Sequence, residues 1–356
     1  MTATLEQPTD IYSRITQKII ADLEKGELTW RKPWSSEHMA SNVMRPLRWN
    51  DQPYSGVNIL VLWATAAENG YQSPYWMTYQ QATSMKANIR KGEKGTQVVY
   101  ADKLTKQKED EKGEMQTHFV PFLKSYTVFN ASQIDGLSDG YYKQPEQKIF
   151  NPQTRIEELE TFFAQTKAEI YTGIKASYYS VKDKIEMPPF ESFIDAPSYY
   201  ATLAHELTHW TKHPTRLDRD LGRTRYGDEG YAKEELVAEL GSCFLSADIG
   251  LEPELRDDHA AYIQSWLEVL KNDKRFIFSA ASQAQKAVEY IFSLQPDKQP
   301  KLNLELLART MPDGTEIKLP NGGTIICTGD NTCQTIEAEG CMPSLYDFSK
   351  RNPSPT

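Results

Sequence analysis

The chain has few of the features that hold extracellular or membrane proteins together. Its 356 residues include only four cysteines, and no two of them form a Cys-x-x-Cys pair. Reduced thiols are therefore expected rather than a disulfide framework. No apolar run approaches the roughly eighteen residues that a membrane helix needs, and residues 1–10 lack the apolar core of a signal peptide. We therefore expect a cytoplasmic protein with no membrane partner.

Positively charged residues are also few, and they are unevenly distributed along the chain. The chain has 40 Lys and Arg against 49 Asp and Glu, a net charge of −9. Residues 30–103 nevertheless hold nine Lys and Arg against five acidic residues, whereas residues 151–300 hold 17 against 25. A basic region inside an acidic protein is typical of a chain with an anionic partner, although an excess of four charges is modest.

Length and local pattern predict an α+β protein of two domains. A chain of this length can bury two cores, and its 39% hydrophobic and 25% charged residues are typical of a globular protein. We predict an N-terminal α/β domain over 1–135, a linker over 136–152 and a mainly helical domain with a small sheet over 153–298. Residues 299–356 form a C-terminal extension, either a small appendage or partly disordered.

The most informative segment is His205-Glu206-Leu207-Thr208-His209, which has the pattern H-E-x-x-H. Residues four apart lie on one face of an α-helix, so His205 and His209 can aim their rings at one metal ion. Ser198 is the predicted N-cap of that helix. Glu206 would lie beside the metal as the general base. The alternative is a buried helix that carries two histidines and binds no metal.

A catalytic zinc ion takes three protein ligands and a water, so a third ligand is needed. The best source is the acidic cluster of a second helix, predicted over 231–247. Glu235 is the predicted third ligand, and Glu239, one turn later, would accept the free N–H of a ligand histidine and fix its tautomer. Glu234 is a less favoured third ligand, and a solvated acidic helix face is the alternative for all three. Gly241 and Ser242 allow the two helices to pack closely.

This arrangement resembles the thermolysin-like metallopeptidases, in which a Glu from a second helix completes the zinc site and an acidic residue four positions later supports it. The resemblance covers two short helices and implies a zinc-dependent peptide hydrolase. Zn²⁺ lowers the pKa of a bound water towards ~7. Glu206 would accept the proton as that water attacks a carbonyl, and would then pass it to the leaving amine. Sites of this type also accept Mn²⁺ or Co²⁺, so the metal remains open.

The N-terminal region places cations beside aromatic residues and flexible turns. Single-stranded nucleic acid is bound by this mixture, because cations follow the phosphates while bases stack on aromatic faces. The alternative is that the tryptophans are core residues and the cations lie on an ordinary solvated face. The candidate DNA-binding residues are Trp30, Arg31, Lys32, Trp34, Arg45, Arg48, Trp49, Asn50, Tyr54, Trp76, Arg90, Lys91 and Lys94.

The same region resembles the N-terminal domain of the ArdC family of antirestriction proteins. Followed by a zincin-like metallopeptidase domain, it has the order that this family shows, and the resemblance covers about residues 10–295. The resemblance is specific because it requires two unrelated signatures, the N-terminal domain and the metallopeptidase domain, in this order along the chain. The matching segments of the N-terminal domain are Tyr12–Thr16, Trp30–Trp34, Asn50–Asn58, Trp76–Ala82 and Arg90–Thr96.

The resemblance implies a function in DNA transfer. ArdC-like proteins are carried on conjugative plasmids, bind single-stranded DNA without strong sequence preference and protect incoming DNA from host restriction. The metallopeptidase domain implies an unidentified host protein as substrate. Two alternatives remain open: an ssDNA-binding protein whose metal site is purely structural, and a plain metallopeptidase whose basic domain binds protein.

Overall fold

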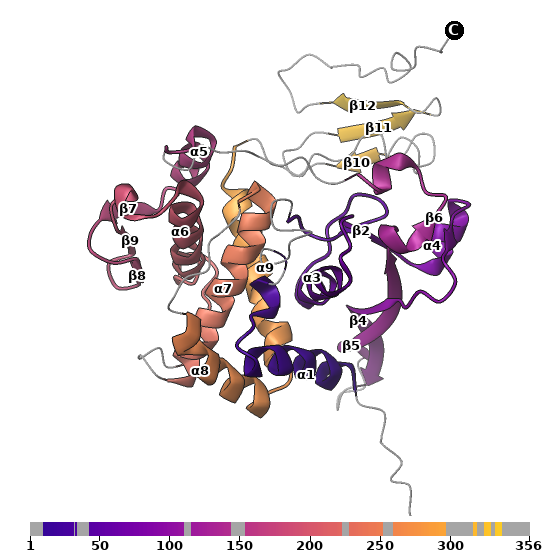
Figure 1. Cartoon of the computed structure of the whole chain (residues 1–356), viewed down its shortest axis with the longest axis horizontal. Coiled ribbons are helices and arrows are strands. Elements are labelled where there is room, and N and C mark those ends of the chain that lie inside the picture. The colour runs from indigo at the N-terminus through magenta and orange to yellow at the C-terminus, as the bar shows by residue number, and fades with distance from the viewer. Residues whose placement is uncertain are drawn as a thin grey trace, which may run out of the picture. The chain divides into compact units, whose positions relative to one another are not determined.

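The computed structural model has helices in both halves of the chain and small sheets beside them (Figure 1). It describes residues 10–31, 33, 43–109, 115–143, 154–222, 228–251 and 259–296, and three short strands after residue 315; of 101–123, 259–261 and those three strands it describes only the backbone. The chain forms two compact units, 1–291 and 292–356. The predicted α+β class is confirmed. None of the described helices has the length and apolarity that a membrane span needs.

The first half of the first unit is built on a four-stranded sheet with the order β1-β2-β5-β4. Helix α3 packs on this sheet through Leu62 and Ala66. Its Asn58 amide also donates to Val99 O at 2.7 Å and accepts from Val99 N at 2.8 Å. The elements are α1 (Ile11–Glu24), η1 (Thr29–Arg31), β1 (Leu47–Arg48), α3 (Val57–Asn69), β2 (Tyr75–Met77), α4 (Tyr79–Ser84), β3 (Asn88–Ile89), β4 (Thr96–Glu109), β5 (Met115–Asn130), η3 (Ala131–Gln133), β6 (Ile134–Asp135) and η4 (Asp139–Tyr141).

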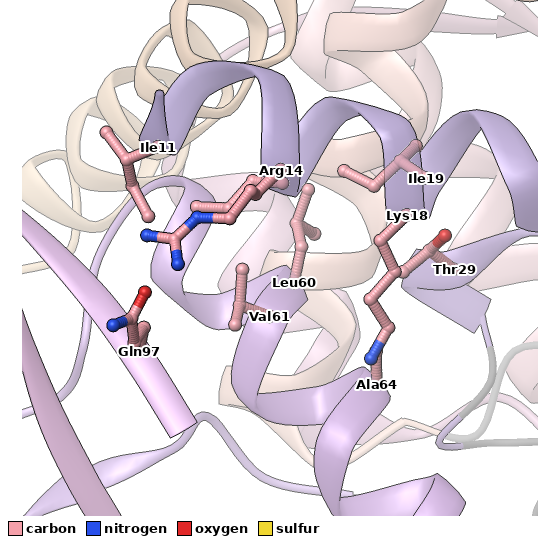
Figure 2. Close-up of a pocket in the computed structure, with 10 residues that line it drawn as sticks. Ile11, Arg14, Lys18, Ile19, Thr29, Leu60, Val61, Ala64 and Gln97 are labelled. Atoms are coloured by element: carbon pink, nitrogen blue, oxygen red, sulfur yellow. The ribbon is translucent and has the colours of Figure 1, made fainter. Parts of the chain in front are cut away.

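A pocket of about 130 Å³ lies between α1 and α3, close to the start of β4 (Figure 2). Ile19 and Leu60 give it an apolar wall, while Arg14 and Lys18 line it with longer, charged side chains. Lys18 also forms an ion pair with Glu68 at 2.8 Å. This pocket belongs to the N-terminal half and includes none of the residues of the H-E-x-x-H segment.

The second half of the first unit is mainly helical, with one three-stranded sheet of order β7-β9-β8. The central strand β9 is parallel to β7 and antiparallel to β8, and α6 packs beside β8 and β9. The elements are α5 (Glu157–Gln165), β7 (Glu169–Thr172), β8 (Ser177–Tyr179), β9 (Lys184–Met187), η5 (Phe190–Ser192), α6 (Ala196–Trp210), α7 (Glu229–Ile249), α8 (His259–Asn272) and α9 (Phe276–Ser293). In the second unit, β10 (Glu316–Lys318), β11 (Thr324–Thr328) and β12 (Thr332–Ile336) form an antiparallel sheet.

Buried side chains join the two halves of the first unit. Arg45 forms an ion pair with Asp248 of α7 at 2.8 Å. Trp30 is completely buried and meets Trp266 of α8 edge to face, with 5.5 Å between ring centroids. The predicted linker over 136–152 is described only as far as residue 143. The predicted domain boundaries therefore stay predictions, while the two halves share one buried interface.

The start of α6 corrects one sequence prediction. Asp195, not Ser198, is the N-cap, because its carboxylate accepts the Ser198 backbone N–H at 2.8 Å. Pro197 lies within the first turn, where a missing N–H costs no hydrogen bond. The helix therefore begins two residues before Ser198 and runs through the complete H-E-x-x-H segment.

Helices α6 and α7 approach each other closely at Gly241. A Cβ at this position would lie 2.5 Å from Thr208 Cγ2 and 2.7 Å from Thr208 Oγ1, closer than side-chain atoms can pack. Next to it, Ser242 Oγ donates to Ala201 O at 2.9 Å and ties the helices together. The predicted role of Gly241 in close helix packing agrees with this geometry.

We expect Gly241→Ala to destabilise the protein by about 1–3 kcal/mol, because the added methyl overpacks the α6–α7 contact. At an open helix position the same change would stabilise the helix by up to about 1 kcal/mol. The sign of the change in the free energy of unfolding therefore distinguishes a close contact from open space. Chemical denaturation of Gly241→Ala, Thr208→Ala and the double variant measures the effect. Thr208→Ala should recover much of the loss in the double variant. Equal losses with and without Thr208 would contradict the close contact.

Candidate metal centre

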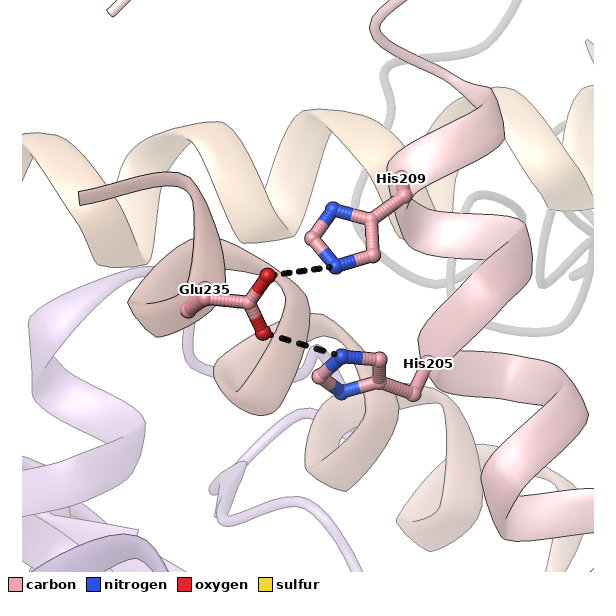
Figure 3. A group of neighbouring side chains, drawn as sticks. All are labelled: His205, His209 and Glu235. Carbon is pink, nitrogen blue, oxygen red and sulfur yellow. Dashed lines mark ion pairs between the residues drawn. The ribbon is translucent and has the colours of Figure 1, made fainter. Parts of the chain in front are cut away.

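His205, His209 and Glu235 meet between α6 and α7 (Figure 3). Their ligand atoms all lie within 4.8 Å of one another, and all three residues are buried. The Glu235 carboxylate faces both rings, with Oε2 3.5 Å from His205 Nε2 and Oε1 3.4 Å from His209 Nε2. The helical spacing thus brings the two histidines to one point, and the second helix brings the carboxylate to the same point.

This donor set fits a divalent metal ion. Two ligands that each lie about 2.1 Å from one tetrahedral ion are about 3.4 Å apart, and both nitrogen–oxygen distances in the cluster are close to that value. Two imidazole nitrogens and one carboxylate are the ligands of a catalytic zinc site, which keeps its fourth position for water. The geometry therefore leaves room for an ion among the three side chains without a change of fold.

The electrostatics of the cluster also favour a cation. Burial raises the pKa of Glu235, but the charges and hydrogen bonds of His209 and His205 outweigh it and hold the pKa well below the usual range. Burial lowers the pKa of His209, but Glu235 and Glu234 outweigh it and raise the pKa overall. The site therefore keeps an ionised carboxylate and attracts positive charge at its centre, which a divalent ion would supply.

Each histidine is backed by a carboxylate of α7 on its other ring nitrogen. Glu239 Oε1 lies 3.2 Å from His205 Nδ1, at the place predicted for the tautomer-fixing residue. Glu234 Oε1 lies 3.1 Å from His209 Nδ1. From the sequence, Glu234 was predicted only as a less favoured third ligand, and its contact with His209 was not predicted. The contact could have been predicted from the histidines themselves, because each metal-bound histidine needs an acceptor for its Nδ1–H, and two histidines need two acceptors.

Two buried arginines hold these outer carboxylates. Arg219 forms a bidentate pair with Glu234, with Nη2–Oε1 at 2.8 Å and Nε–Oε2 at 2.9 Å. Burial raises the pKa of Glu234, but Arg219 and His209 outweigh it and lower the pKa to about 2. Arg31 Nη2 lies 3.3 Å from Glu239 Oε2. Neither arginine was predicted in this position, because each lies far from its carboxylate in the sequence.

Glu206 and Tyr231 are the other reactive groups close to the ligands in the sequence. Glu206 follows His205 on α6 and is 4% exposed. The hydroxyl of Tyr231 lies 3.1 Å from that of Tyr262, and burial, followed by this contact, raises the pKa of Tyr231 above its usual range. Tyr231 therefore stays a neutral phenol, which can donate a hydrogen bond.

Five of the residues predicted to contact DNA are buried and form packing or ion-pair contacts instead. The side chains of Arg31 and Arg45 already neutralise Glu239 and Asp248, so the structure corrects their assignment to phosphates. Aromatic side chains inside the core cannot stack on a base. Their burial matches the alternative stated for the sequence, in which the tryptophans are core residues. The five buried residues are Trp30, Arg31, Arg45, Tyr54 and Trp76.

The remaining candidates divide into two groups. Lys32 and Trp34 lie outside the described residues. The others are at least partly exposed, and Trp49 has 36% of its surface accessible. Arg90 forms ion pairs with Glu93 at 3.0 Å and Asp135 at 3.5 Å. The six candidates that solvent reaches are Arg48, Trp49, Asn50, Arg90, Lys91 and Lys94.

Comparison with known proteins assigns both halves of the chain. Residues 9–129 match the family model described as the N-terminal domain of the anti-restriction factor ArdC, and residues 157–283 match the zincin-like metallopeptidase family. A Sinorhizobium fredii protein known as uncharacterized protein y4eC is 41% identical over 302 residues, which cover 83% of this chain and 96% of that protein. Escherichia coli DNA primase TraC is 36% identical over 301 residues, 80% of this chain but 27% of the primase.

Solved structures give the same answer. The crystal structure of the antirestriction protein ArdC from plasmid R388 in its metal-free form has a TM-score of 0.70 and 46% identity, and covers 80% of this chain and 98% of that one. The Mn(II)-bound structure of the same protein has a TM-score of 0.67 and 45% identity, and covers 82% and 100%. The chain therefore belongs to the family of ArdC antirestriction proteins, with an ArdC N-terminal domain followed by a zincin-like metallopeptidase domain.

Proposed function

We propose that this protein binds single-stranded DNA without sequence preference, protects incoming plasmid DNA during conjugation, and hydrolyses an unidentified host protein in the cytoplasm. The hydrolase activity is supported by the buried cluster of His205, His209 and Glu235, whose ligand atoms lie within 4.8 Å of one another. Membership of the ArdC family supports the antirestriction activity.

In this proposal His205, His209 and Glu235 hold Zn²⁺, while Mn²⁺, which the R388 relative binds in its crystal structure, and Co²⁺ are alternatives. A bound divalent ion supplies Lewis acidity, which makes water a nucleophile near neutral pH and polarises a carbonyl. Glu206 accepts the proton of the attacking water and delivers it to the leaving amine.

The outer carboxylates prepare the histidines for this task. Glu234 forms a hydrogen bond with His209 Nδ1 at 3.1 Å, and Glu239 Oε1 lies 3.2 Å from His205 Nδ1, so the Nε2 atom of each ring faces Glu235 and the metal position. Both contacts lie in a buried site, where the four side chains are at most 9% exposed. The three glutamates of α7 thus have separate roles, because Glu235 binds the metal while Glu234 and Glu239 orient the two histidines.

The DNA-binding surface that we propose is smaller than the sequence predicted. It combines the turn at Arg48, Trp49 and Asn50 with the basic turn that carries Lys91 and Lys94. The Arg48 guanidinium lies over the Tyr54 ring at 5.2 Å. The next residue, Trp49, is 36% exposed and is available for stacking with a base. Cations beside an exposed aromatic residue are the features that support the proposal.

Metal binding should depend on Glu235 and not on Glu206. We expect about one zinc per chain in the wild type and in Glu206→Gln, but less than a tenth of that in Glu235→Ala, since two imidazoles alone bind weakly. Elemental analysis after dialysis measures the stoichiometry. Glu229→Ala is the matched control, because Glu229 lies on the same helix, is exposed and pairs with Lys233 at 2.6 Å. Metal in Glu235→Ala would contradict the ligand set.

Proteolysis should depend on Glu206. We expect the zinc-loaded wild type to create new N-termini in an extract of a restriction-proficient host, and Glu206→Gln to reduce them at least ~100-fold, because the proton has no acceptor. Mass spectrometry of labelled N-termini identifies the substrate at the same time. If the metal-loaded wild type creates none, the site is structural, and the alternative of a binding protein replaces the hydrolase.

DNA binding should depend on salt and on the basic turn. We expect Lys91→Glu/Lys94→Glu to weaken binding of a thymidine oligonucleotide about tenfold and to reduce the slope of log K against log salt by about 1.4, which corresponds to two lost phosphate contacts. Fluorescence anisotropy between 50 and about 300 mM salt gives both quantities. Lys182→Glu/Lys286→Glu, in the second half of the chain, is the control with the same charge change. Wild-type binding that ignores salt would favour a protein partner for the basic domain.

A further inference from the structure

The two metal-facing histidines are supported by two similar chains of contacts. One runs from His209 to Glu234 and ends at Arg219, which lies between α6 and α7 in the sequence. The other runs from His205 to Glu239 and ends at Arg31. The second arginine belongs to the ArdC N-terminal domain, 208 residues away from Glu239 along the chain.

We propose that Arg31 is a positioning residue of the metal centre, so that the N-terminal domain completes the metallopeptidase site. The inference rests on the proposed role of His205 as a metal ligand. Arg31 acts through Glu239 and does not itself reach the ion: its Nη2 atom lies 3.3 Å from Glu239 Oε2, while the other oxygen of the same carboxylate faces His205 Nδ1 at 3.2 Å.

The requirement for a cation beside Glu239 follows from burial. Both side chains of the Arg31–Glu239 pair are 4% exposed. A buried carboxylate is stable only when its oxygens have charged or hydrogen-bonding partners. The guanidinium of Arg31 supplies such a partner at Oε2, which leaves Oε1 directed at His205 Nδ1. Arg31 therefore fixes the orientation of the carboxylate that faces His205.

The turn that carries Arg31 is fixed on both sides. Thr29 Oγ1 donates to Asp22 Oδ2 of α1 at 2.8 Å, within the N-terminal half. Trp30 is fully buried and packs edge to face on Trp266 of α8, in the second half. The backbone of η1 thus has anchors in both domains, and the Arg31 guanidinium enters the metal centre from a defined position rather than from a flexible loop.

The structure also provides a matched control. Arg45 is likewise buried, belongs to the N-terminal domain and pairs with α7, through Asp248 at 2.8 Å. Asp248 lies nine residues beyond Glu239, which is about 13 Å along a helix. Loss of Arg45 therefore removes an ion pair between the same two halves without touching the carboxylates of the metal centre, although the Asp248 side chain is 22% exposed and that of Glu239 only 4%.

The test is the metal affinity of full-length apoprotein, measured by zinc competition with a chromogenic chelator, for the wild type, Arg31→Gln, Arg31→Lys and Arg45→Gln. We expect Arg31→Gln to weaken zinc binding about 10–100-fold, the usual effect of losing an outer partner of a ligand. Arg31→Lys should recover part of the loss, and Arg45→Gln should stay within about twofold of the wild type. The Co²⁺ absorption spectrum should change in Arg31→Gln and stay unchanged in Arg45→Gln.

Unchanged affinity in Arg31→Gln, or equal losses in Arg31→Gln and Arg45→Gln, would overturn the inference, since either result makes Arg31 an ordinary interface residue. If Arg31→Gln does not fold, the pair Arg31→Lys and Arg45→Lys decides the question, with a loss of several fold expected only in the first. A wild type that binds no metal is a different result, because it removes the proposed function rather than the role of Arg31.

Discussion

The close approach of α6 and α7 is the constraint on which the metal centre depends. Gly241 lets the helices come so near that a side chain at this position would collide with Thr208. At that separation Glu235 reaches both histidine rings at 3.4–3.5 Å, and Glu234 and Glu239 reach the far sides of the same rings. A wider separation would leave the same residues on the same faces but out of reach of a common ion.

Charge balance is the second constraint, because the approach gathers three buried carboxylates in a small volume. The cluster is tolerable only because Arg219 pairs with Glu234, Arg31 pairs with Glu239, and the histidines face Glu235. Burial alone would raise the pKa of each carboxyl, yet the pKa values of Glu234 and Glu235 are lowered. The arrangement keeps Glu234 and Glu235 ionised and leaves the centre attractive to a divalent cation.

Local periodicity explains what could be predicted from the sequence. The α+β class, the pairing of His205 with His209 and that of Glu235 with Glu239 depend on spacing within single helices, which the sequence encodes directly. The partner of each ring nitrogen depends on how two helices cross, so the contact of Glu234 with His209 could not be predicted from spacing. Composition likewise cannot separate a stacking platform from a core, and Trp30 belongs to the core.

The central claim is that a metal ion binds to two imidazoles and one carboxylate of this chain. X-ray absorption spectroscopy of the zinc-loaded full-length protein tests the donor set directly. The account predicts only nitrogen and oxygen neighbours at about 2.0–2.1 Å, with the outer-shell signature of two imidazole rings. A sulfur neighbour at about 2.3 Å would contradict it, because zinc would then be bound by cysteine at another position.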